Sequence, residues 1–312
     1  MTAQGCRQVV GWLAVGISTV VSCFWAFWGS IENFHEGWFY TSLLMNLAMM
    51  VVQYLSPMLF FMGLSLVSLR WPRLGGALHA ATAAGAIWFF RGASWKVVFP
   101  FIGGPLAFLG ACYVWGRPSP RRWAAAVVIG LPLVTLVVCG AEPALRVGSR
   151  LDDGYRGPRH LEANGVDLIW APEGPGWPSH GVSWKEAGHR CRYLNEEGTA
   201  LANSPQDIWR LPTVEEAVRS QCRGGENCAG LWDVVQMKAS YKRKPDKESP
   251  LWDIHSKVIY WWTATEVNDQ KAHIIVYNGQ VHPRAKRGQP GYLGFRAVKS
   301  LIDGPSTEST KP

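Results

Sequence analysis

GVSWKEAGHRCRYLNEEGTALANSPQDIWRLPTVEE, residues 181–216, contains two helix starts of the same form. Ser183-Trp-Lys-Glu186 and Thr213-Val-Glu-Glu216 each place a hydroxyl side chain three residues before a glutamate. This is the pattern of a capping box, in which the hydroxyl and the carboxylate each accept a hydrogen bond from a backbone amide of the first turn. The stretch therefore predicts a folded module with two capped helices.

The lengths of the two helices follow from the residues around each cap. Apolar residues recur at helical spacing from Trp184 to Leu194, so the first helix is expected to end near residues 196–198. Pro212 excludes an earlier start for the second helix, because the residue before a proline disfavours the helical conformation. The second helix is expected to reach about Gln221.

Predicted strands lie on both sides of the two helices. They are rich in β-branched and aromatic residues, and they cover residues 166–171, 258–265, 272–277, 280–283 and 294–299. Asn278-Gly279 predicts a hairpin with a type I′ turn. The basic stretch 242–247 is predicted to be a solvated loop. Together the elements predict an α+β domain.

Several of these strings resemble one known superfamily. They are GVSWxEA at 181–187, WRLPT at 209–213, YWWT at 260–263 and GFRAV at 294–298. They resemble the formylglycine-generating enzyme, or sulfatase-modifying factor, superfamily. They are equally similar to its relatives with a C-type-lectin-like fold, including the Lcl C-terminal type of bacterial surface domain. The resemblance covers about residues 166–299 and implies a C-type-lectin-like α+β domain at 166–302.

The activity that this resemblance implies needs residues that this chain lacks. Oxidase members of the superfamily use a cysteine pair near the end of the domain, which binds copper. The corresponding stretch here, residues 286–299, contains no cysteine. The resemblance therefore implies the fold without the sulfatase-activating chemistry.

The first half of the chain has a different composition. Five apolar runs qualify as candidate membrane spans, at residues 9–29, 40–69, 74–90, 97–115 and 123–140. All charged side chains of this half fall between the runs. We expect an all-α transmembrane bundle of about five helices. Because the third run is short and rich in alanine and glycine, a four-span arrangement stays open. Residues 143–165 are expected to be a linker, and the polar residues 303–312 a disordered tail.

The basic residues between the runs predict the orientation. They fall in three segments that share one side of a five-span bundle: Arg7, then Arg70 and Arg73, then Arg117, Arg121 and Arg122. Basic loops face the cytoplasm, so the N-terminus is expected there. The C-terminal domain is then expected in the periplasm or outside the cell, carried by a multi-pass plasma membrane protein, most simply of a bacterial inner membrane. Arg91 and Lys96 are the exception, since they fall on the opposite side.

The net charge of +8 does not indicate nucleic-acid binding. Residues 1–142 carry eight basic and three acidic side chains, so most of the excess belongs to the loops that set the orientation. The bilayer is the partner that the composition itself indicates.

Trp261, Trp262 and Arg296 are the candidate ligand-binding residues. Neighbours in a strand point to opposite faces, so one tryptophan is expected to fill the core and the other to cover a loop. The alternative is that one ring forms a platform for a sugar or a peptide. Arg296 lies beside predicted core residues and either binds a ligand or pairs internally, as we also expect of Arg210.

Glu266, Asn268 and Asp269 form a cluster of oxygen ligands after the strand at 258–265, and calcium is the cation that suits them. A solvated turn is the favoured alternative, because the spacing matches no defined calcium loop. Cys222 and Cys228 flank a flexible RGGEN stretch and could form a disulfide outside the cytoplasm, or stay free thiols.

Three functions remain open. The first is a membrane-anchored extracytoplasmic module that binds a protein, a peptide or a glycan. The second is a divergent metal-dependent oxidoreductase of the sulfatase-modifying factor superfamily. The third is a structural subunit of a membrane complex that associates through its helices.

Overall fold

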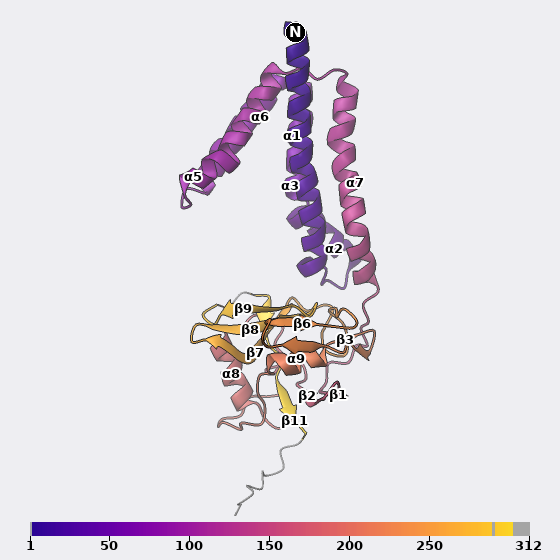
Figure 1. Ribbon diagram of the computed structural model, residues 1–312, viewed down its shortest axis with the longest axis vertical. Helices are drawn as coiled ribbons and strands as arrows, with labels where there is room; N and C mark the ends of the chain where they lie inside the picture. The colour runs from indigo at the N-terminus through magenta and orange to yellow at the C-terminus, as the bar shows by residue number, and fades with distance from the viewer. Residues whose placement is uncertain (1, 289–290, 302–312) are drawn as a thin grey trace, which may run out of the picture. The chain divides into compact units, whose positions relative to one another are not determined.

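The structure is a computed structural model that describes residues 2–288 and 291–301. The chain divides into two compact units, Met1–Val147 and Gly148–Pro312 (Figure 1). The first contains helices alone among its described residues, and the second contains the sheets. The predicted helical half and the sheet-containing C-terminal domain are therefore confirmed. The tail predicted at 303–312 lies outside the described residues.

The N-terminal unit consists of α-helices joined by short π-helical segments. These are α1 (Ala3–Glu32), η1 (Asn33–Gly37), α2 (Leu43–Met49), η2 (Met50–Tyr54), α3 (Ser56–Arg70), α4 (Pro72–Phe89), α5 (Trp95–Val98), η3 (Phe99–Gly103), α6 (Gly104–Trp115) and α7 (Arg121–Gly148). A helix satisfies all its backbone hydrogen bonds internally, which suits runs this apolar in a medium without water. The polar loops between the runs end the helices.

Among the described residues, three helical stretches are long and apolar enough to cross a membrane: Ala3–Gly37, Trp95–Trp115 and Arg121–Gly148. The pair Leu43–Tyr54 and Ser56–Arg70 is bent by 59° and makes a fourth if it counts as one broken span. The five predicted spans are therefore not all found. The run at 74–90 does form a helix, α4, but this helix is not apolar enough to qualify.

Helix α4 nevertheless lies antiparallel along η3 and α6. Small residues allow the close approach, as they do between membrane helices in general. A Cβ atom added to Gly76 of α4 would lie 2.2 Å from Val114 of α6, and one added to Gly103 of η3 would lie 2.7 Å from Ile87 of α4. At 18 residues, α4 is about 27 Å long, close to the thickness of a bilayer core.

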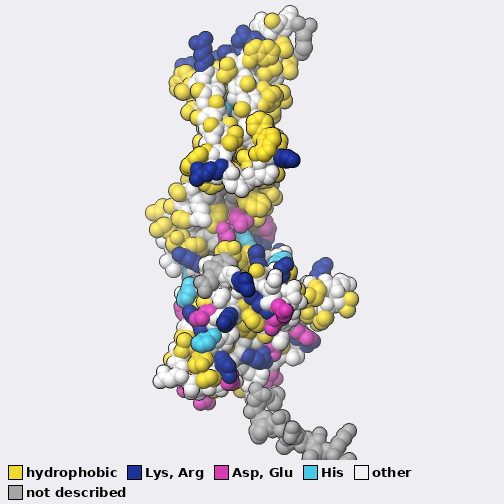
Figure 2. Space-filling view, turned by 90° about the vertical axis from the view of Figure 1, so that its left-hand side faces the viewer, with side chains coloured by type: hydrophobic (Ala, Val, Ile, Leu, Met, Phe, Trp, Pro, Cys, Tyr) yellow, Lys and Arg dark blue, Asp and Glu magenta, His cyan; other side chains and the backbone are white. Residues whose placement is uncertain are grey.

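One end of the N-terminal unit gathers most of its basic residues (Figure 2), and Arg91 and Lys96 lie at the other end. Arg7 accepts a backbone hydrogen bond from Arg117 at 2.8 Å, which joins the start of α1 to the α6–α7 loop. Arg70, Arg73 and Arg117 line one shallow depression. Arg121 begins α7 at the same end, so the three basic segments of the sequence meet there.

Exposed tryptophans mark both ends of this unit. Trp71, Trp115 and Trp123 lie at the basic end, and Trp28, Trp88 and Trp95 lie at the opposite ends of their helices. Tryptophan is enriched where membrane-spanning helices meet the polar interface. The two sets therefore suit a bundle whose helices reach both faces of a bilayer.

Within the part of the C-terminal unit that the structure describes, there are two larger sheets, two small hairpins and two helices. The three-stranded sheet has the order β1-β2-β11, and the four-stranded sheet has the order β10-β7-β8-β9. The strands are β1 (Arg159–Ala163), β2 (Val166–Trp170), β3 (Cys222–Arg223), β4 (Glu226–Asn227), β5 (Leu231–Asp233), β6 (Lys238–Ser240), β7 (Tyr260–Asn268), β8 (Lys271–Val276), β9 (Val281–Ala285), β10 (Leu293–Gly294) and β11 (Val298–Ser300). The helices are α8 (Trp184–Tyr193) and α9 (Val214–Ser220).

Aromatic residues fill the core between these layers. Trp252 stacks on Trp261 of β7 with ring centroids 3.6 Å apart, and Trp170 of β2 packs against the same ring. A second cluster contains Trp262, Cys191 of α8 and Trp209. Buried aromatic pairs of this kind add stabilisation beyond the area that they bury.

Both predicted helices form where the caps place them. Thr213 and Glu216 make the complete capping box at α9. The Oγ of Ser183 accepts from the amide of Glu186 at α8, but the Glu186 carboxylate pairs with Arg190 instead of reaching back. Helix α8 ends at Tyr193, earlier than expected.

The strand predictions hold with two differences. The segment predicted at 294–299 splits between β10, which pairs with β7, and β11, which pairs with β2. The β8–β9 hairpin forms at Asn278-Gly279, but only Gly279 has a positive φ, so the turn is not type I′. The Asn278 Oδ1 accepts from the amide of Gln280 and fixes the turn in another way.

Two segments are more ordered than predicted. Part of the predicted linker at 143–165 extends α7, and another part forms β1. Within the basic stretch predicted as a solvated loop, Asp246 and Lys247 are buried, as are the following Glu248 and Ser249. Asp246 pairs with Arg150 at 2.8 Å and with Arg223 at 3.4 Å, so this buried carboxylate is ion-paired inside the domain.

Candidate functional site

The candidate tryptophans lie inside the domain. Trp261 and Trp262 are each 0% exposed and point into different core clusters on opposite faces of β7. The Nε1 of Trp262 donates to the carbonyl of Val182 at 2.8 Å. Opposite faces are as expected, but neither ring is available as a platform for a sugar or a peptide.

Arg296 is also a structural residue. Its side chain is fully buried, donates from Nε to the carbonyl of Ala171 at 2.9 Å and lies over the ring of Trp177 at 3.8 Å. Burial, together with the positive charges of Arg159 and Arg156, holds the pKa of this guanidinium well below its usual range. Arg296 therefore braces the loop that joins β10 to β11 and offers no ligand surface. Arg210 pairs with Glu216 at 2.7 Å, as predicted.

The candidate calcium ligands do not converge. Glu266 pairs with the ammonium group of Lys286. The Oδ1 of Asn268 accepts from the amides of Gln270 and Lys271 and so closes the β7–β8 turn. Across the described residues, no group of three or more His, Cys, Asp and Glu side chains could hold a metal ion. The favoured solvated turn agrees with this geometry better than a calcium site does.

The two candidate disulfide partners are both free thiols in this structure. Burial, with the neighbouring Cys228 and Glu248, raises the pKa of the Cys222 thiol to about 12. Burial also raises the pKa of Cys228 to about 11. Reactive cysteines have lowered pKa values and exposed sulfurs, so these thiols are structural in character.

The β5–β6 hairpin presents an apolar surface that the sequence reasoning missed. Its tip exposes Val234 by 68% and Val235 by 93%, and Leu231 and Met237 are also exposed. Together these four residues are the hairpin tip. Alternating strands at the edge of a core usually expose polar residues, and a large exposed apolar patch marks an interaction surface more often than an accident of packing. The signal in the sequence was the pair Val234-Val235, which belongs to no predicted core element.

The hairpin tip is held in one conformation. The Oδ1 of Asp233 accepts from the amides of Val235 and Gln236, each at 2.9 Å, and this caps the turn. Trp232 packs its ring against the core and meets His273 edge-on at 5.9 Å. Because the base is anchored and the turn is capped, the apolar tip is a preorganised surface, which lowers the entropy lost on binding.

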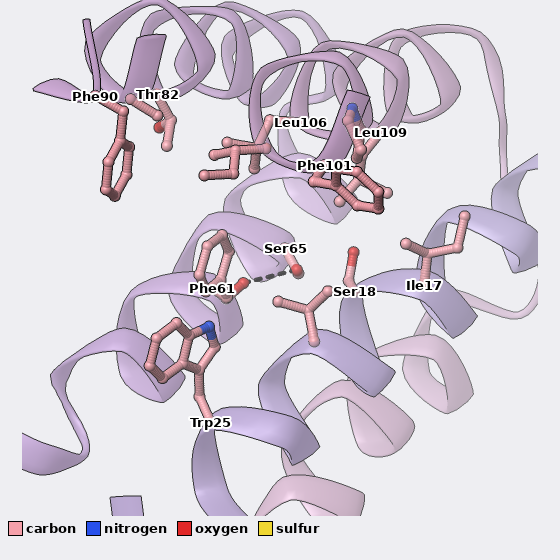
Figure 3. A pocket seen from close by; sticks show the side chains of 14 residues that line it. Ile17, Ser18, Trp25, Phe61, Ser65, Thr82, Phe90, Phe101, Leu106 and Leu109 are labelled. Carbon is pink, nitrogen blue, oxygen red and sulfur yellow. Dashed lines mark hydrogen bonds between the residues drawn. The ribbon is translucent and has the colours of Figure 1, made fainter. Parts of the chain in front are cut away.

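A second candidate site lies in the N-terminal unit. A cavity of about 410 Å³ opens between α1, α3, α4 and the η3–α6 segment (Figure 3). Its walls are almost entirely apolar and include Trp25, Phe61, Phe101 and Leu106. The volume falls within the roughly 300–1,000 Å³ of small-molecule sites.

The hydroxyl groups of this cavity are already paired. Ser18 Oγ lies 2.8 Å from the carbonyl of Ala14, to which it donates, and 2.9 Å from Tyr113 Oη. Ser65 Oγ donates to the carbonyl of Phe61 at 2.7 Å (Figure 3). Thr82 Oγ1 donates to the carbonyl of Leu78 at 2.8 Å. The cavity therefore presents hydrocarbon, with its hydroxyl groups turned to the helix backbones.

Comparison with known proteins adds no relative, since no family model, no curated protein and no solved structure matches this chain.

Proposed function

We propose that this protein is a membrane-anchored interaction module whose C-terminal domain is displayed outside the cytoplasm and binds a protein partner through the β5–β6 hairpin tip. The observation that carries the proposal is the exposure of Val234 and Val235 on a turn that Asp233 holds rigid. The C-type-lectin-like, sulfatase-modifying factor-like nature of the domain remains part of the proposal, resting on the sequence resemblance.

The orientation rests on α7 and on the basic end of the N-terminal unit. Helix α7 starts at Arg121, among the basic residues, and runs away from them to Gly148, where the C-terminal unit begins. It qualifies as a span by itself. If basic residues face the cytoplasm, the C-terminal domain lies on the other side, whether or not α4 counts as a span.

A protein fits the hairpin tip better than a glycan or a bilayer does. Glycan sites use aromatic faces, whereas the tip is aliphatic and the candidate tryptophans are buried. Membrane-inserting tips carry aromatic residues beside an excess of positive charge. Here Asp233 and Lys238 lie opposite each other in the strand register, so the hairpin has one charge of each sign and no excess of positive charge. Aliphatic side chains on a rigid turn suit an apolar pocket of a protein.

An enzyme of the superfamily is supported less well. Oxidase chemistry would need reactive thiols or a metal, and the domain's cysteines are buried with raised pKa values. A structural subunit that associates through its helices remains an alternative, and the experiment below separates it from the proposal.

The test is site-specific photo-cross-linking of the full-length protein in the membrane of its own host. A benzophenone side chain at Val235 is compared with one at Val267, which is 40% exposed on β7 and serves as the matched control. We expect Val235, and not Val267, to give one protein adduct of defined mass. Val234→Asp should reduce that adduct at least tenfold, because burying one aliphatic side chain is worth roughly 1.5–3 kcal/mol.

Three outcomes contradict the proposal. Cross-links from Val235 to lipid alone would make the hairpin a bilayer contact. If Val235 and Val267 cross-link to protein equally, the hairpin has no specific role in binding. The same holds if the Val235 adduct is unchanged by Val234→Asp. A third benzophenone at Val20, which is 69% exposed on α1, tests the other alternative: a protein adduct from Val20 with none from Val235 would favour a structural subunit.

A further inference from the structure

The cavity of the N-terminal unit is closed at one end and open at the other. Its floor is formed by Ser18 and Leu109, which are 2% and 4% exposed. Its rim includes Phe90 and Phe101, which are 41% and 76% exposed. Phe90 follows α4 directly, and Phe101 lies in η3, so the cavity opens toward the α4–α5 turn, away from the basic end.

The helices that line the cavity diverge at its open end. In Figure 1 the α5–α6 segment splays away from α1 toward its α5 end, and the cavity lies in the wedge between them. Because these helices include candidate spans, the surroundings of the wedge are lipid chains and not water. A flexible hydrocarbon chain could enter from the side without crossing a polar barrier.

Two positive charges stand at the open end. Arg91 follows Phe90 in the α4–α5 turn, and Lys96 lies in the first turn of α5. The Arg91 guanidinium lies over the ring of Trp88 at 5.0 Å. Among the described residues, neither Arg91 nor Lys96 forms an ion pair with a carboxylate. These are the two residues that depart from the positive-inside pattern, so topology gives no reason for them.

We propose that the cavity binds one acyl chain of an anionic bilayer phospholipid, whose phosphate is held by Arg91 and Lys96. The hydrocarbon walls and internally paired hydroxyls accept the chain, and the two basic side chains select the headgroup. The occupant is a bilayer lipid because the cavity lies between helices that the bilayer surrounds. If the orientation proposed above holds, the lipid belongs to the outer leaflet; the lipid site itself stands without it.

Two substitutions on α4 separate chain binding from helix stability. Ala86 lines the cavity, so Ala86→Trp should fill it. Ala84 lies two residues away, is exposed and does not line the cavity, so Ala84→Trp is the matched control. Arg91→Gln with Lys96→Gln removes the two charges and leaves the cavity unchanged.

The experiment uses full-length protein reconstituted in phosphatidylcholine vesicles with phosphatidylglycerol as the anionic lipid. Native mass spectrometry after extraction then reads how much of each lipid stays bound. We expect wild type and Ala84→Trp to retain phosphatidylglycerol over phosphatidylcholine by at least tenfold, since each basic residue near a membrane surface contributes roughly a fivefold factor. Ala86→Trp should lose both lipids, and the double glutamine variant should lose only the preference.

Three results would overturn the assignment. The first is equal retention of the two lipids by wild type. The second is an Ala86→Trp variant that retains lipid as Ala84→Trp does, with both variants monodisperse. The third is displacement of phosphatidylglycerol by a small fraction of a long-chain prenyl phosphate, which would assign the site to a carrier lipid. The hairpin cross-link is unaffected by any of these, so the two proposals fail separately.

Discussion

Lys247 shows how strongly the interior of the C-terminal unit constrains one side chain. It is 2% exposed, and its ammonium group donates to the carbonyl of Ser256. Burial, together with the positive charge of Arg150, lowers the pKa of Lys247 to about 7, although Asp253 and Asp246 oppose the shift. The group is therefore half neutral near pH 7 in the folded protein.

This lowered pKa predicts a pH dependence of stability. Unfolded, Lys247 titrates at the usual lysine value of roughly 10.4, so between about pH 7 and that value the unfolded state holds a proton that the folded state lacks. The free energy of unfolding should therefore rise with pH across this window. Relative to Lys247→Met, wild type should gain roughly 2 kcal/mol between pH 7 and pH 9.

Urea-dependent pulse proteolysis of the full-length protein in detergent micelles measures this gain as survival of the C-terminal unit. Lys244→Met is the matched control, because Lys244 is exposed in the same stretch and should leave the pH profile unchanged. Parallel profiles for wild type and Lys247→Met would show that Lys247 is not neutralised on folding.

At the residue scale, the sequence predicted the strand faces and charge pairing of the candidate side chains better than it predicted whether they bind a ligand. The opposite faces of Trp261 and Trp262 and the pairing of Arg210 follow from strand alternation and charge, and both are found. The burial of both tryptophans could not be predicted, because it depends on which distant segments cover each face of β7. Trp252 covers one of them from a loop.

At the scale of elements, the two capped helices differ in how completely their caps form. The Thr213 hydroxyl accepts from the amide of Glu216, and the Glu216 carboxylate accepts from the amide of Thr213 at 2.8 Å. Burial favours the neutral form of Glu216, but the hydrogen bonds from Arg210 and Thr213 outweigh it and lower its pKa. At α8 the corresponding glutamate bonds elsewhere.

Removing the glutamate at each helix start should therefore have unequal effects. Glu216→Ala, which removes the second hydrogen bond of the capping box, should lower the free energy of unfolding of the C-terminal unit by about 1–2 kcal/mol. Glu186→Ala, which removes only an ion pair within the helix, should lower it by about 0.3–0.5 kcal/mol. The same pulse proteolysis compares them, with Ser240→Ala at an exposed strand position as the control. A loss for Glu186→Ala as large as that for Glu216→Ala would contradict the difference between the two caps.

The sequence predicted most elements of the C-terminal unit because their signals are local. Capping boxes, β-branched runs and Asn-Gly turns act within a few residues, and α8, α9, β7 and β8 follow them. The β5–β6 hairpin was missed because its strands have three residues each, and its turn is fixed by the Asp233 side chain instead of a glycine. The division of residues 294–299 between two sheets depends on long-range pairing that no local pattern contains.

At the scale of the whole molecule, the chain joins a helical unit with an apolar cavity to a domain that presents an apolar hairpin. The helical unit could be predicted from hydropathy, since long apolar runs have few alternatives. The cavity could not, because it results from the splay of α5–α6 from α1, which side-chain packing decides. The close packing of α4 along α6 likewise could not be predicted from the composition of α4.

The topology is the claim on which the proposed function depends. The side of the membrane on which the C-terminal unit lies depends on whether α7 spans, because α7 starts among basic residues at Arg121 and leads to that unit. A chain that ends before α7, after Ser119, should place its end on the basic, cytoplasmic side. A chain that includes α7 should place its end on the other side.

The most direct test is a pair of reporter fusions in cells, using alkaline phosphatase, which is active outside the cytoplasm, and a green fluorescent protein, which fluoresces inside it. Fused after Thr307, the phosphatase should be active and the fluorescent protein should be dark. Fused after Ser119, the phosphatase should be inactive and the fluorescent protein should fluoresce. Fluorescence without phosphatase activity at Thr307 would place the C-terminal domain in the cytoplasm and contradict the account.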